Sequence, residues 1–381
     1  MPASELNLKV NLTYGDDYIQ GQDTRSRQIM FIFWGIIIPI ISVIGFFGNM
    51  LTIIVLFRRE MKSTTVYFLR TLVVTDTGII VVGGIIGLSV ISITQLNPKM
   101  WLFTDVIYPH IYTPTNYIVM TLQMLNVWTT VAVSVERYIA ICHPFKSVRI
   151  CNKKNAFLMI GIITVISILY NIPRCFATWF TRCGETDGHA CYTVITTKFG
   201  QSFFYSEIYT LWLYMTLIYI IPLALLGVLN TLLILELMRM RRRRSVPNIQ
   251  ENSEANMSIV LILIVIVFIC CQTPGLVAQF QFLHPHVLLQ WTCVSNTLFV
   301  LNSSVNFLIY TAVGRKFRKI LLKTFQVFIK RPVNQLKTSY SQGAPYSQNG
   351  GTELTKLTQK PIAYDSEEMS DETCNLKGCG R

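Results

Sequence analysis

The sequence predicts an all-α membrane protein, a bundle of seven transmembrane helices followed by a short amphipathic helix. Of its 381 residues, 51% are hydrophobic and only 14% are charged, a composition too apolar for an ordinary soluble domain. A membrane-spanning helix needs roughly 20 apolar residues, and seven segments of the chain meet that requirement. Basic residues gather in alternate loops, as expected when a chain crosses a bilayer repeatedly.

Charged residues delimit the seven helices. The first is expected over 29–57, because no charged residue lies between Arg27 and Arg58. The second is expected over 64–93 and carries Asp76 at membrane depth. The other five are expected between residues 105 and 136, 154 and 174, 207 and 236, and in the uncharged stretch 255–314, which breaks at 284–286.

The segment 314–330, after the seventh helix, has basic residues on one helical face and apolar residues on the other. The apolar face consists of Phe317, Ile320, Leu321, Thr324, Phe325 and Phe328. Such a helix lies along the inner membrane surface. The predicted organisation is therefore an extracellular tail (1–28), a transmembrane domain (29–313), this surface helix, and a disordered polar tail (331–381).

The basic loops also predict orientation. Loops after helices one, three, five and seven carry the Lys and Arg residues, and cationic loops remain in the cytoplasm. We therefore expect a multi-pass protein of the plasma membrane with an extracellular N-terminus. In that orientation Asn11 is the glycosylation candidate, because Asn256 is cytosolic and Asn302 lies within a helix. The net charge of +13 then reflects membrane anchoring, not nucleic-acid binding.

One carboxylate, Asp76, is expected deep in the membrane, where ionisable groups are costly and need polar partners. Five polar residues on helices one, three and seven are candidates to surround it: Asn49, Asn126, Asn302, Ser303 and Asn306. Two interpretations are open. Either the cluster satisfies the carboxylate through waters or a sodium ion, the one cofactor that the residues suggest, or it joins helices through hydrogen bonds.

The tripeptide Glu136-Arg137-Tyr138 ends the third helix at the cytoplasmic boundary. A guanidinium held there by the neighbouring carboxylate can be released when helices move, which exposes a cationic docking point. Three residues alone can also be a simple surface ion pair. The position at the inner end of a predicted span makes the motif specific.

Over residues 29–330 the chain resembles the rhodopsin-like class of G-protein-coupled receptors. The resemblance rests on motifs that occur in order along the helices: Gly48-Asn49, Leu72 with Asp76, Glu136-Arg137-Tyr138, Pro222, Phe268 with Cys271 and Pro274, and Asn306 with Tyr310. It implies that Arg137 engages a heterotrimeric G protein, that Asp76 holds sodium, and that Pro274 kinks the helix that swings outward on activation.

Several positions depart from this class. Gln272 occupies the place of the aromatic switch, Phe307 replaces the proline after Asn306, and Asn230 replaces a tyrosine. Tyr112 stands where the third helix usually carries a cysteine, so the usual disulfide to the second extracellular loop is not expected. Cys183 and Cys191 in that loop are then candidates for a local disulfide, against free thiols or a pair with Cys293.

A narrower resemblance, to invertebrate FMRFamide-type neuropeptide receptors, rests on NSSVNFLIY over 302–310 and NIPRCF over 171–176. Ala177 departs from the acidic residue that often follows the second motif. The resemblance implies a peptide ligand. Ser366 and Ser370 in the tail, each before two acidic residues, are candidate sites for receptor kinases and arrestin, although a simply solvated tail is the equal alternative.

The residues themselves limit the ligand. No acidic residue lies between Asp105 and Glu136 to bind an amine, and no lysine lies in the seventh helix to bind retinal. A cationic peptide would meet acidic and aromatic groups at the outer mouth. The candidates are Asp105, Glu185, Asp187, Glu207, Trp101, Tyr108, Tyr112, Phe282 and the deeper Gln272. Simple solvation of the acidic residues and interfacial anchoring of the aromatic ones are the alternatives.

Other classes fit less well. A transporter or channel would show repeats or charge relays, and the sequence has one buried carboxylate and no repeat. An enzyme would need a nucleophile with its base, a metal motif or a phosphate loop, and none is recognised in the sequence. A non-peptide small molecule is the alternative ligand class.

Overall fold

A computed structural model describes residues 28–94, 98–186, 189–243, 249–279 and 285–326. Within these residues, seven helical segments are long and apolar enough to cross a membrane, which confirms the predicted class. In chain order we call them spans 1 to 7: Gln28–Leu56, Thr64–Thr94, Leu102–Cys142, Lys153–Ala177, Phe204–Met240, Asn256–Ala278 and Val287–Val313. Their ends lie within a few residues of the charges that predicted them.

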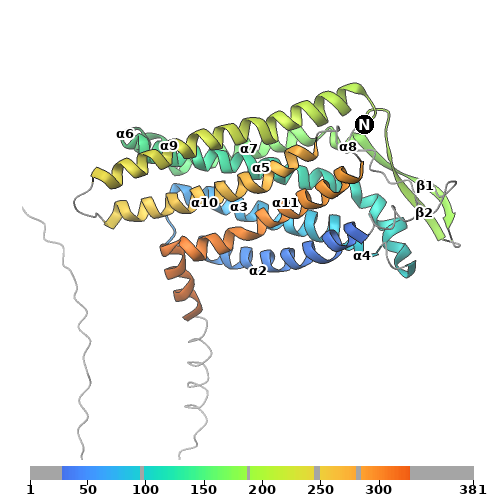
Figure 1. The fold of residues 1–381 in the computed structure, drawn as a ribbon, viewed down its shortest axis with the longest axis horizontal. Coiled ribbons are helices and arrows are strands. Elements are labelled where there is room, and N and C mark those ends of the chain that lie inside the picture. Colours follow the sequence, from blue (N-terminus) through green and yellow to red (C-terminus); the bar gives the residue numbers. More distant parts are fainter. Residues whose placement is uncertain (1–27, 95–97, 187–188, 244–248, 280–284, 327–381) are drawn as a thin grey trace, which may run out of the picture. The chain divides into compact units, whose positions relative to one another are not determined.

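Most spans combine α-helical and wider π-helical turns. The elements of spans 1 to 3 are η2 (Phe31–Ile37), α2 (Ile38–Leu56), α3 (Thr64–Gly78), η3 (Ile79–Val90), α4 (Ile91–Thr94), η5 (Leu102–Ile107) and α5 (Tyr108–Cys142). Those that follow are α6 (Pro144–Ile150), α7 (Lys153–Asn171), α8 (Arg174–Ala177), η6 (Phe204–Leu213), η7 (Met215–Ile220), α9 (Ile221–Arg243), α10 (Ile249–Ala278) and α11 (Pro285–Val313). Figure 1 shows the helices side by side.

A two-stranded antiparallel hairpin between spans 4 and 5 was not predicted. It consists of β1 (Thr178–Thr186) and β2 (His189–Thr196). The register shifts between Arg182 and Gly184, and Gly184 has φ of +127°, a conformation that glycine adopts without strain. The hairpin lies beyond one end of the bundle and α6 lies at the other (Figure 1), and we call these the hairpin end and the Arg137 end.

Small residues let spans 1 and 7 approach closely. A Cβ atom on Gly45 would lie 2.9 Å from the Cα of Ser304, and one on Gly48 would lie 3.0 Å from the Cβ of Phe307. Close backbone contact of this kind is how helices associate in lipid, where burial of apolar surface gives little driving force. Large apolar side chains such as Ile44, Phe47 and Leu158 point out of the bundle, as expected for a lipid-facing surface.

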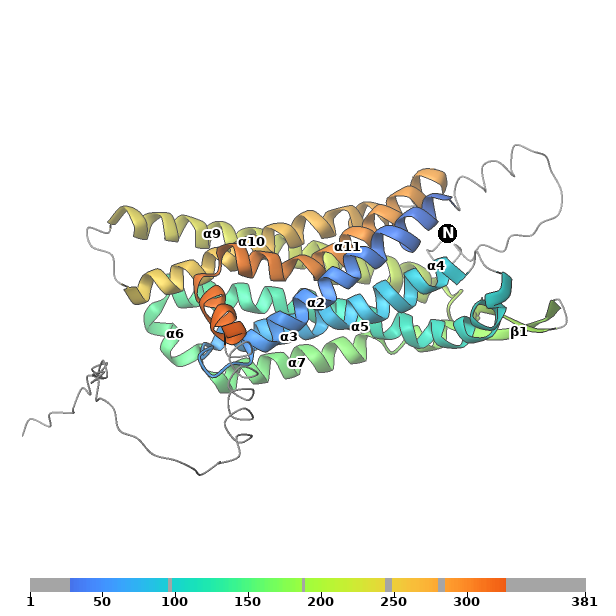
Figure 2. The ribbon, with the colours of Figure 1, turned by 90° about the horizontal axis from the view of Figure 1, so that it is seen from below.

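After span 7 the chain turns at Gly314 into a helix over 315–326, coloured orange-red in Figure 2. Phe317 stacks on Tyr310 of span 7, with ring centroids 5.4 Å apart. On the predicted apolar face, Phe317, Ile320 and Thr324 are buried, whereas Phe325 is exposed. The Lys323 ammonium pairs with the Glu60 carboxylate at 3.3 Å. A backbone hydrogen bond at Glu60, together with Lys323, holds the pKa of that carboxyl below its usual value.

Candidate functional site

Arg137, at the end of the bundle opposite the hairpin, is held by its sequence neighbour. Its Nε donates to Oε2 of Glu136 and its Nη2 to Oε1, both at 2.7 Å. Thr65 of span 2 donates a further hydrogen bond of 2.9 Å to Oε2. Arg137 and Glu136 are both buried. The pair is therefore a fully formed bidentate contact fixed by a second helix, and sequence reasoning did not identify Thr65.

Tyr138, the third residue of the motif, does not join this contact. Its ring lies edge-on to His143, with centroids 5.5 Å apart. His143 precedes the short helix α6, which presents two exposed apolar side chains. Phe145 is 96% exposed and Val148 is 85% exposed, outside any span. Exposed apolar patches often mark a contact with another protein or with the membrane, so α6 is a candidate docking element.

Asp76, in the middle of span 2, is buried and accepts hydrogen bonds from two amides. Asn126 of span 3 donates to Oδ1 at 2.8 Å, and Asn306 of span 7 donates to Oδ2 at 2.7 Å. Both residues were predicted partners. Asn302 is buried too, but it makes no hydrogen bond with Asp76. The carboxylate therefore joins three spans.

Two buried oxygens near this cluster lack hydrogen-bond partners among the described residues: Oδ1 of Asn49 and Oγ of Ser303. Asn49 reaches the same turn of span 7, because its Nδ2 donates to the backbone oxygen of Ser303 at 3.0 Å. Hard cations take oxygen ligands, and the Ser303 side chain lies within hydrogen-bonding reach of the Asp76 carboxylate. The oxygen-rich donor set of Asp76, Ser303 and Asn49 therefore fits a small cation such as sodium.

Span 6 carries two predicted activation residues, Phe268 and Pro274, and the pocket candidate Gln272, in different surroundings. Phe268 is buried in a cluster with Met124 and Val127 of span 3. Gln272, which occupies the place of the aromatic switch, is also buried. Pro274 lies inside α10, next to Gly275. A Cβ on Gly275 would lie 2.8 Å from the hydroxyl of Tyr219 in span 5, so span 5 packs directly against the proline position.

Tyr310 of span 7 is buried against the helix over 315–326, as described above. Its place four residues after Asn306 puts both residues on the same face of α11. Asn306 thereby binds Asp76 while Tyr310 anchors the following helix. The predicted pair connects the centre of the bundle to its Arg137 end.

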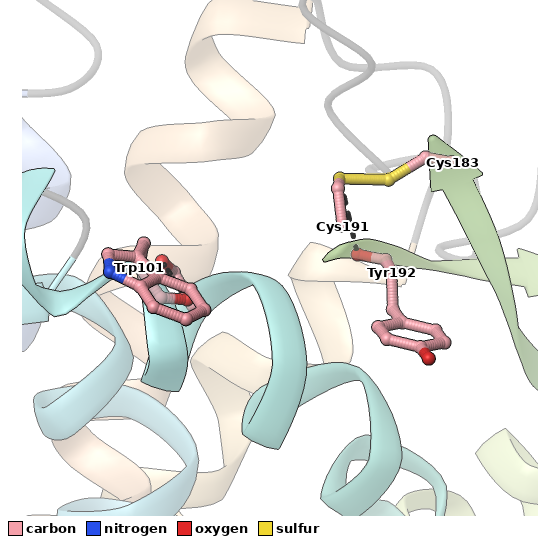
Figure 3. The surroundings of a disulfide bond; sticks show 5 residues. Trp101, Cys183, Cys191 and Tyr192 are labelled. Carbon is pink, nitrogen blue, oxygen red and sulfur yellow. Dashed lines mark hydrogen bonds between the residues drawn. A yellow bond between two sulfur atoms is a disulfide. The ribbon is translucent and has the colours of Figure 1, made fainter. Parts of the chain in front are cut away.

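A disulfide joins Cys183 of β1 to Cys191 of β2, so the local pairing predicted from the sequence is confirmed. Figure 3 shows this bond across the hairpin, with the ring of Tyr192 on the opposite side. Six other cysteines within the described residues are free thiols, including Cys293. The covalent constraint therefore closes the hairpin on itself and does not connect it to span 3.

Span 3 holds the hairpin through non-covalent contacts instead. The Thr113 hydroxyl lies 2.8 Å from the Thr178 hydroxyl. The His110 ring packs against Phe180 and Tyr192, at centroid distances of 3.9 and 4.9 Å. In addition, the ring of Trp101 stacks on that of His189 in β2, with centroids 3.8 Å apart and nearly parallel planes. Sequence reasoning proposed Trp101 but missed the two histidines, because nothing local marks their partners.

The predicted ligand-pocket residues are brought together only in part. Tyr108 and Tyr112 lie edge to face, 5.8 Å apart, on successive turns of span 3. Asp105 on η5 and Glu207 on η6 are half-buried at the same end of the bundle. The Glu185 side chain, Asp187, Phe282, Asn11, Phe328 and the two tail serines lie outside the part that the structure describes.

Spans 4 and 5 meet around a buried arginine, Arg174 of the NIPRCF motif, for which no role was predicted. Arg174 is 8% exposed, and its guanidinium lies over the rings of Tyr209 and Tyr214 at 5.5 and 5.3 Å. Tyr214 in turn donates a hydrogen bond of 3.0 Å to Gln123 of span 3. The signal in the sequence was a lone cation, directly after Pro173, at the end of an apolar span.

Comparison with known proteins agrees with this geometry. Residues 48–310 match the family described as 7 transmembrane receptor (rhodopsin family). The FMRFamide receptor of Drosophila melanogaster is 31% identical over 313 residues, which cover 82% of this chain and 56% of that receptor. An FMRFamide peptide receptor of Caenorhabditis elegans is 24% identical, covering 91% and 80% of the two chains. The human neuromedin-U receptor 2 is 26% identical, covering 84% and 78%.

Proposed function

This chain belongs to the rhodopsin family of seven-transmembrane receptors, and we propose that it is a plasma-membrane neuropeptide receptor that activates heterotrimeric G proteins. The observation that carries the proposal is the buried Glu136–Arg137 pair, which Thr65 fixes at one end of a seven-span bundle. It is a multi-pass membrane protein. Among the described residues, no group of three His, Cys, Asp or Glu side chains is placed to hold a metal.

Two observations support an extracellular hairpin end and N-terminus. The disulfide between Cys183 and Cys191 lies there, and disulfides persist in oxidising compartments. The loops at the Arg137 end carry the basic residues that are retained in the cytoplasm. Redox state and charge therefore agree on one orientation.

A peptide ligand is supported by the relatives and by the surface at the hairpin end. Two of the relatives named above are receptors for FMRFamide peptides. The half-buried carboxylates Asp105 and Glu207 suit a cationic peptide residue, and the rings of Tyr108 and Tyr112 suit an aromatic one. The hairpin adds two short strands, whose edges offer backbone groups to an extended peptide. An FMRFamide-related peptide is the specific ligand we propose.

In the proposed mechanism, the structure corresponds to the inactive state. Arg137 is paired and buried, so its charge is not available at the surface. A ligand that binds a second conformation better shifts the population toward it. Movement of span 6 at Pro274 would open the Arg137 end and release the guanidinium from Glu136. The exposed Phe145 and Val148 of α6 would then complete the G-protein contact.

The central polar cluster would tune this equilibrium. Asp76, with the free oxygens of Ser303 and Asn49, would hold a sodium ion between spans 1, 2 and 7. A cation there adds positive charge beside a buried carboxylate and supports the packed arrangement of these spans. Any rearrangement of span 7 that draws Asn306 away from Asp76 weakens the site. Arrestin and receptor kinases are the proposed partners of the tail.

The test is G-protein activation in cells that express this chain, challenged with amidated neuropeptides and their free-acid counterparts. Peptides ending in Arg-Phe-amide form one arm of the panel, and non-peptide transmitters form another. We expect nanomolar to micromolar activation by an amidated peptide, with loss of potency as the free acid. A response only to a non-peptide transmitter would overturn the peptide assignment. Ligand-dependent ion flux without nucleotide exchange would overturn the receptor mechanism.

A further inference from the structure

Arg174 is a buried cation for which the structure supplies no anion. The guanidinium donates one hydrogen bond, from Nε to the side-chain oxygen of Asn171 at 3.0 Å. The guanidinium also lies over the rings of Tyr209 and Tyr214, and the Tyr209 side chain is a further hydrogen-bonding partner. Within the described residues, no carboxylate lies within ion-pair distance of it. A guanidinium carries a full charge and five N–H donors, and none of these neutral partners neutralises that charge.

The other arginines packed into the bundle are satisfied. Arg137, equally buried, is neutralised by Glu136. Arg70 also faces two aromatic rings, those of Phe57 and Tyr67, but two of its nitrogens donate to the backbone oxygen of Leu56 at 3.0 and 2.8 Å. Arg174 is the one of the three that lacks both a carboxylate and a backbone acceptor. Burying an ionised group in this way is unfavourable unless a partner arrives.

The surroundings of Arg174 specify the chemistry of that partner. The tyrosine rings hold the guanidinium without neutralising it, because a ring face attracts a cation but accepts no strong hydrogen bond. Nε donates to Asn171. The two terminal nitrogens form a planar fork that matches the two oxygens of a carboxylate. The site lies at the hairpin end of the bundle, between spans 4 and 5 and one contact from Gln123 of span 3.

We propose that Arg174, framed by Tyr209 and Tyr214, is the subsite for a carboxylate of the ligand. This inference rests on the proposed function, because it assigns a second chemical group to the same peptide. The carboxylate comes from an Asp or Glu side chain of the peptide, because the amidated C-terminus of the proposed ligand carries no carboxylate. A ligand of this kind carries a cation for Asp105 and Glu207 and an anion for Arg174, which distinguishes it from a purely cationic peptide.

The experiment uses the full chain, purified in lipid nanodiscs, and three dipeptide probes. N-acetyl-Asp-Phe-amide carries a side-chain carboxylate, N-acetyl-Asn-Phe carries a C-terminal one, and N-acetyl-Asn-Phe-amide carries neither. Apparent affinities come from the rise of Tm with probe concentration. We expect N-acetyl-Asp-Phe-amide to bind about tenfold more tightly than the neutral probe, the difference that one good charged contact provides. Preference for N-acetyl-Asp-Phe-amide supports a side-chain carboxylate, whereas preference for N-acetyl-Asn-Phe alone would contradict an amidated ligand whose side chain occupies this subsite.

Three variants locate the effect. Arg174→Gln should abolish the preference, and Arg174→Lys should retain part of it. The matched control is Arg70→Gln, which removes an arginine that also lies over two aromatic rings and should leave the preference unchanged. Equal binding of all three probes to the unaltered chain would overturn the subsite without any variant. A preference that survives Arg174→Gln would overturn it as well.

The probe measurements test the subsite separately from the cell assay, which tests the proposed function. The probe measurements contain no G protein and depend only on the bundle, so their failure removes the subsite and leaves the receptor. Failure of every peptide in the cell assay removes the neuropeptide assignment, while a charge-dependent probe preference at Arg174 would still stand. A purely structural role for Arg174 predicts a lower Tm for Arg174→Gln and no discrimination among the probes, which contradicts the proposal.

Discussion

The guanidinium of Arg137 and the carboxylate of Glu136, adjacent in sequence, are joined by two hydrogen bonds of 2.7 Å. Adjacent residues on a helix do not normally face each other, so both side chains must bend toward a common point. Thr65 of span 2 supplies that point by donating to the same carboxylate. The contact therefore depends on the position of span 2 relative to span 3.

Thr65→Val should raise basal signalling. The substitution keeps the side-chain shape and removes one hydrogen bond to a charged acceptor, worth about 1.5–3 kcal/mol. If that contact is lost when the receptor activates, the active population rises roughly ten- to 150-fold. Ligand-free nucleotide exchange measures this. Thr64→Val is the control, because the Thr64 hydroxyl donates to the backbone of Cys151 and not to Glu136. Unchanged basal exchange in Thr65→Val would separate Thr65 from activation.

Arg137→Ala should abolish G-protein activation while surface expression and peptide binding remain. The reason is that the guanidinium, once released, is the proposed cationic contact with the G protein. Nucleotide exchange and radioligand binding on the same membranes separate the two effects. Arg149→Ala, an exposed position on α6, is the control for loss of one positive charge at this end. Normal signalling by Arg137→Ala would sink the assigned role.

Asp76→Asn should remove the dependence of agonist affinity on sodium. For the unaltered chain we expect agonist affinity to fall by about fivefold or more when sodium chloride replaces N-methylglucamine chloride, a typical allosteric coupling. The variant lacks the charge that holds the ion and should show one affinity in both salts. Competition binding in the two buffers measures the ratio. A sodium effect that persists in Asp76→Asn would leave the cluster only its role in joining spans 2, 3 and 7.

Gly45→Ala should destabilise the bundle. Its Cβ would lie 2.9 Å from the Cα of Ser304, so spans 1 and 7 must separate, at a cost of about 1–3 kcal/mol. Gly161→Ala is the control, since a Cβ there would meet nothing within 4 Å. It should leave stability unchanged or raise it by up to about 1 kcal/mol. Thermal unfolding in nanodiscs measures both, and equal Tm values would argue against close packing of spans 1 and 7.

Replacing Cys183 and Cys191 together by Ala should loosen the hairpin and spare the bundle. Closing a loop this short is worth roughly 2–3 kcal/mol in the chain-entropy estimate. The disulfide joins β1 only to β2, so the loss should not spread to span 3. Hydrogen exchange should therefore rise for the amides of β1 and β2 but not for those of α5. Cys175→Ala, which removes a free thiol, is the control.

Much of this architecture could be predicted from local sequence. A span must be long and apolar, and its flanking charges fix both its ends and its orientation, so the seven helices follow from composition along the chain. The Glu136–Arg137 contact could be predicted because the two residues are neighbours in sequence. The Cys183–Cys191 disulfide could be predicted because the start of span 3 offers these cysteines no partner. The hairpin was missed because its strands mix polar and apolar residues without a strict alternation and are interrupted by a bulge.

The contacts between distant spans were beyond such reasoning. The π-helical turns of η6 and η7 bring residues five apart closer to one face, whereas a 3.6-residue period separates Tyr209 from Tyr214. Arg174 could be recognised as a buried cation only after those rings were placed around it. The same holds for His110 and His189, whose partners lie on the hairpin.

The sequence by itself determined the class of the protein, its seven spans and the chemical groups available at each end, because a bilayer imposes its demands residue by residue. The tertiary structure alone decided which of those groups meet. Asp76 gains its amides from residues 50 and 230 positions away, and Arg174 remains without an anion among the described residues. Both outcomes depend on how the spans cross and rotate, which is set by side-chain packing between helices and not by the polarity of any one of them.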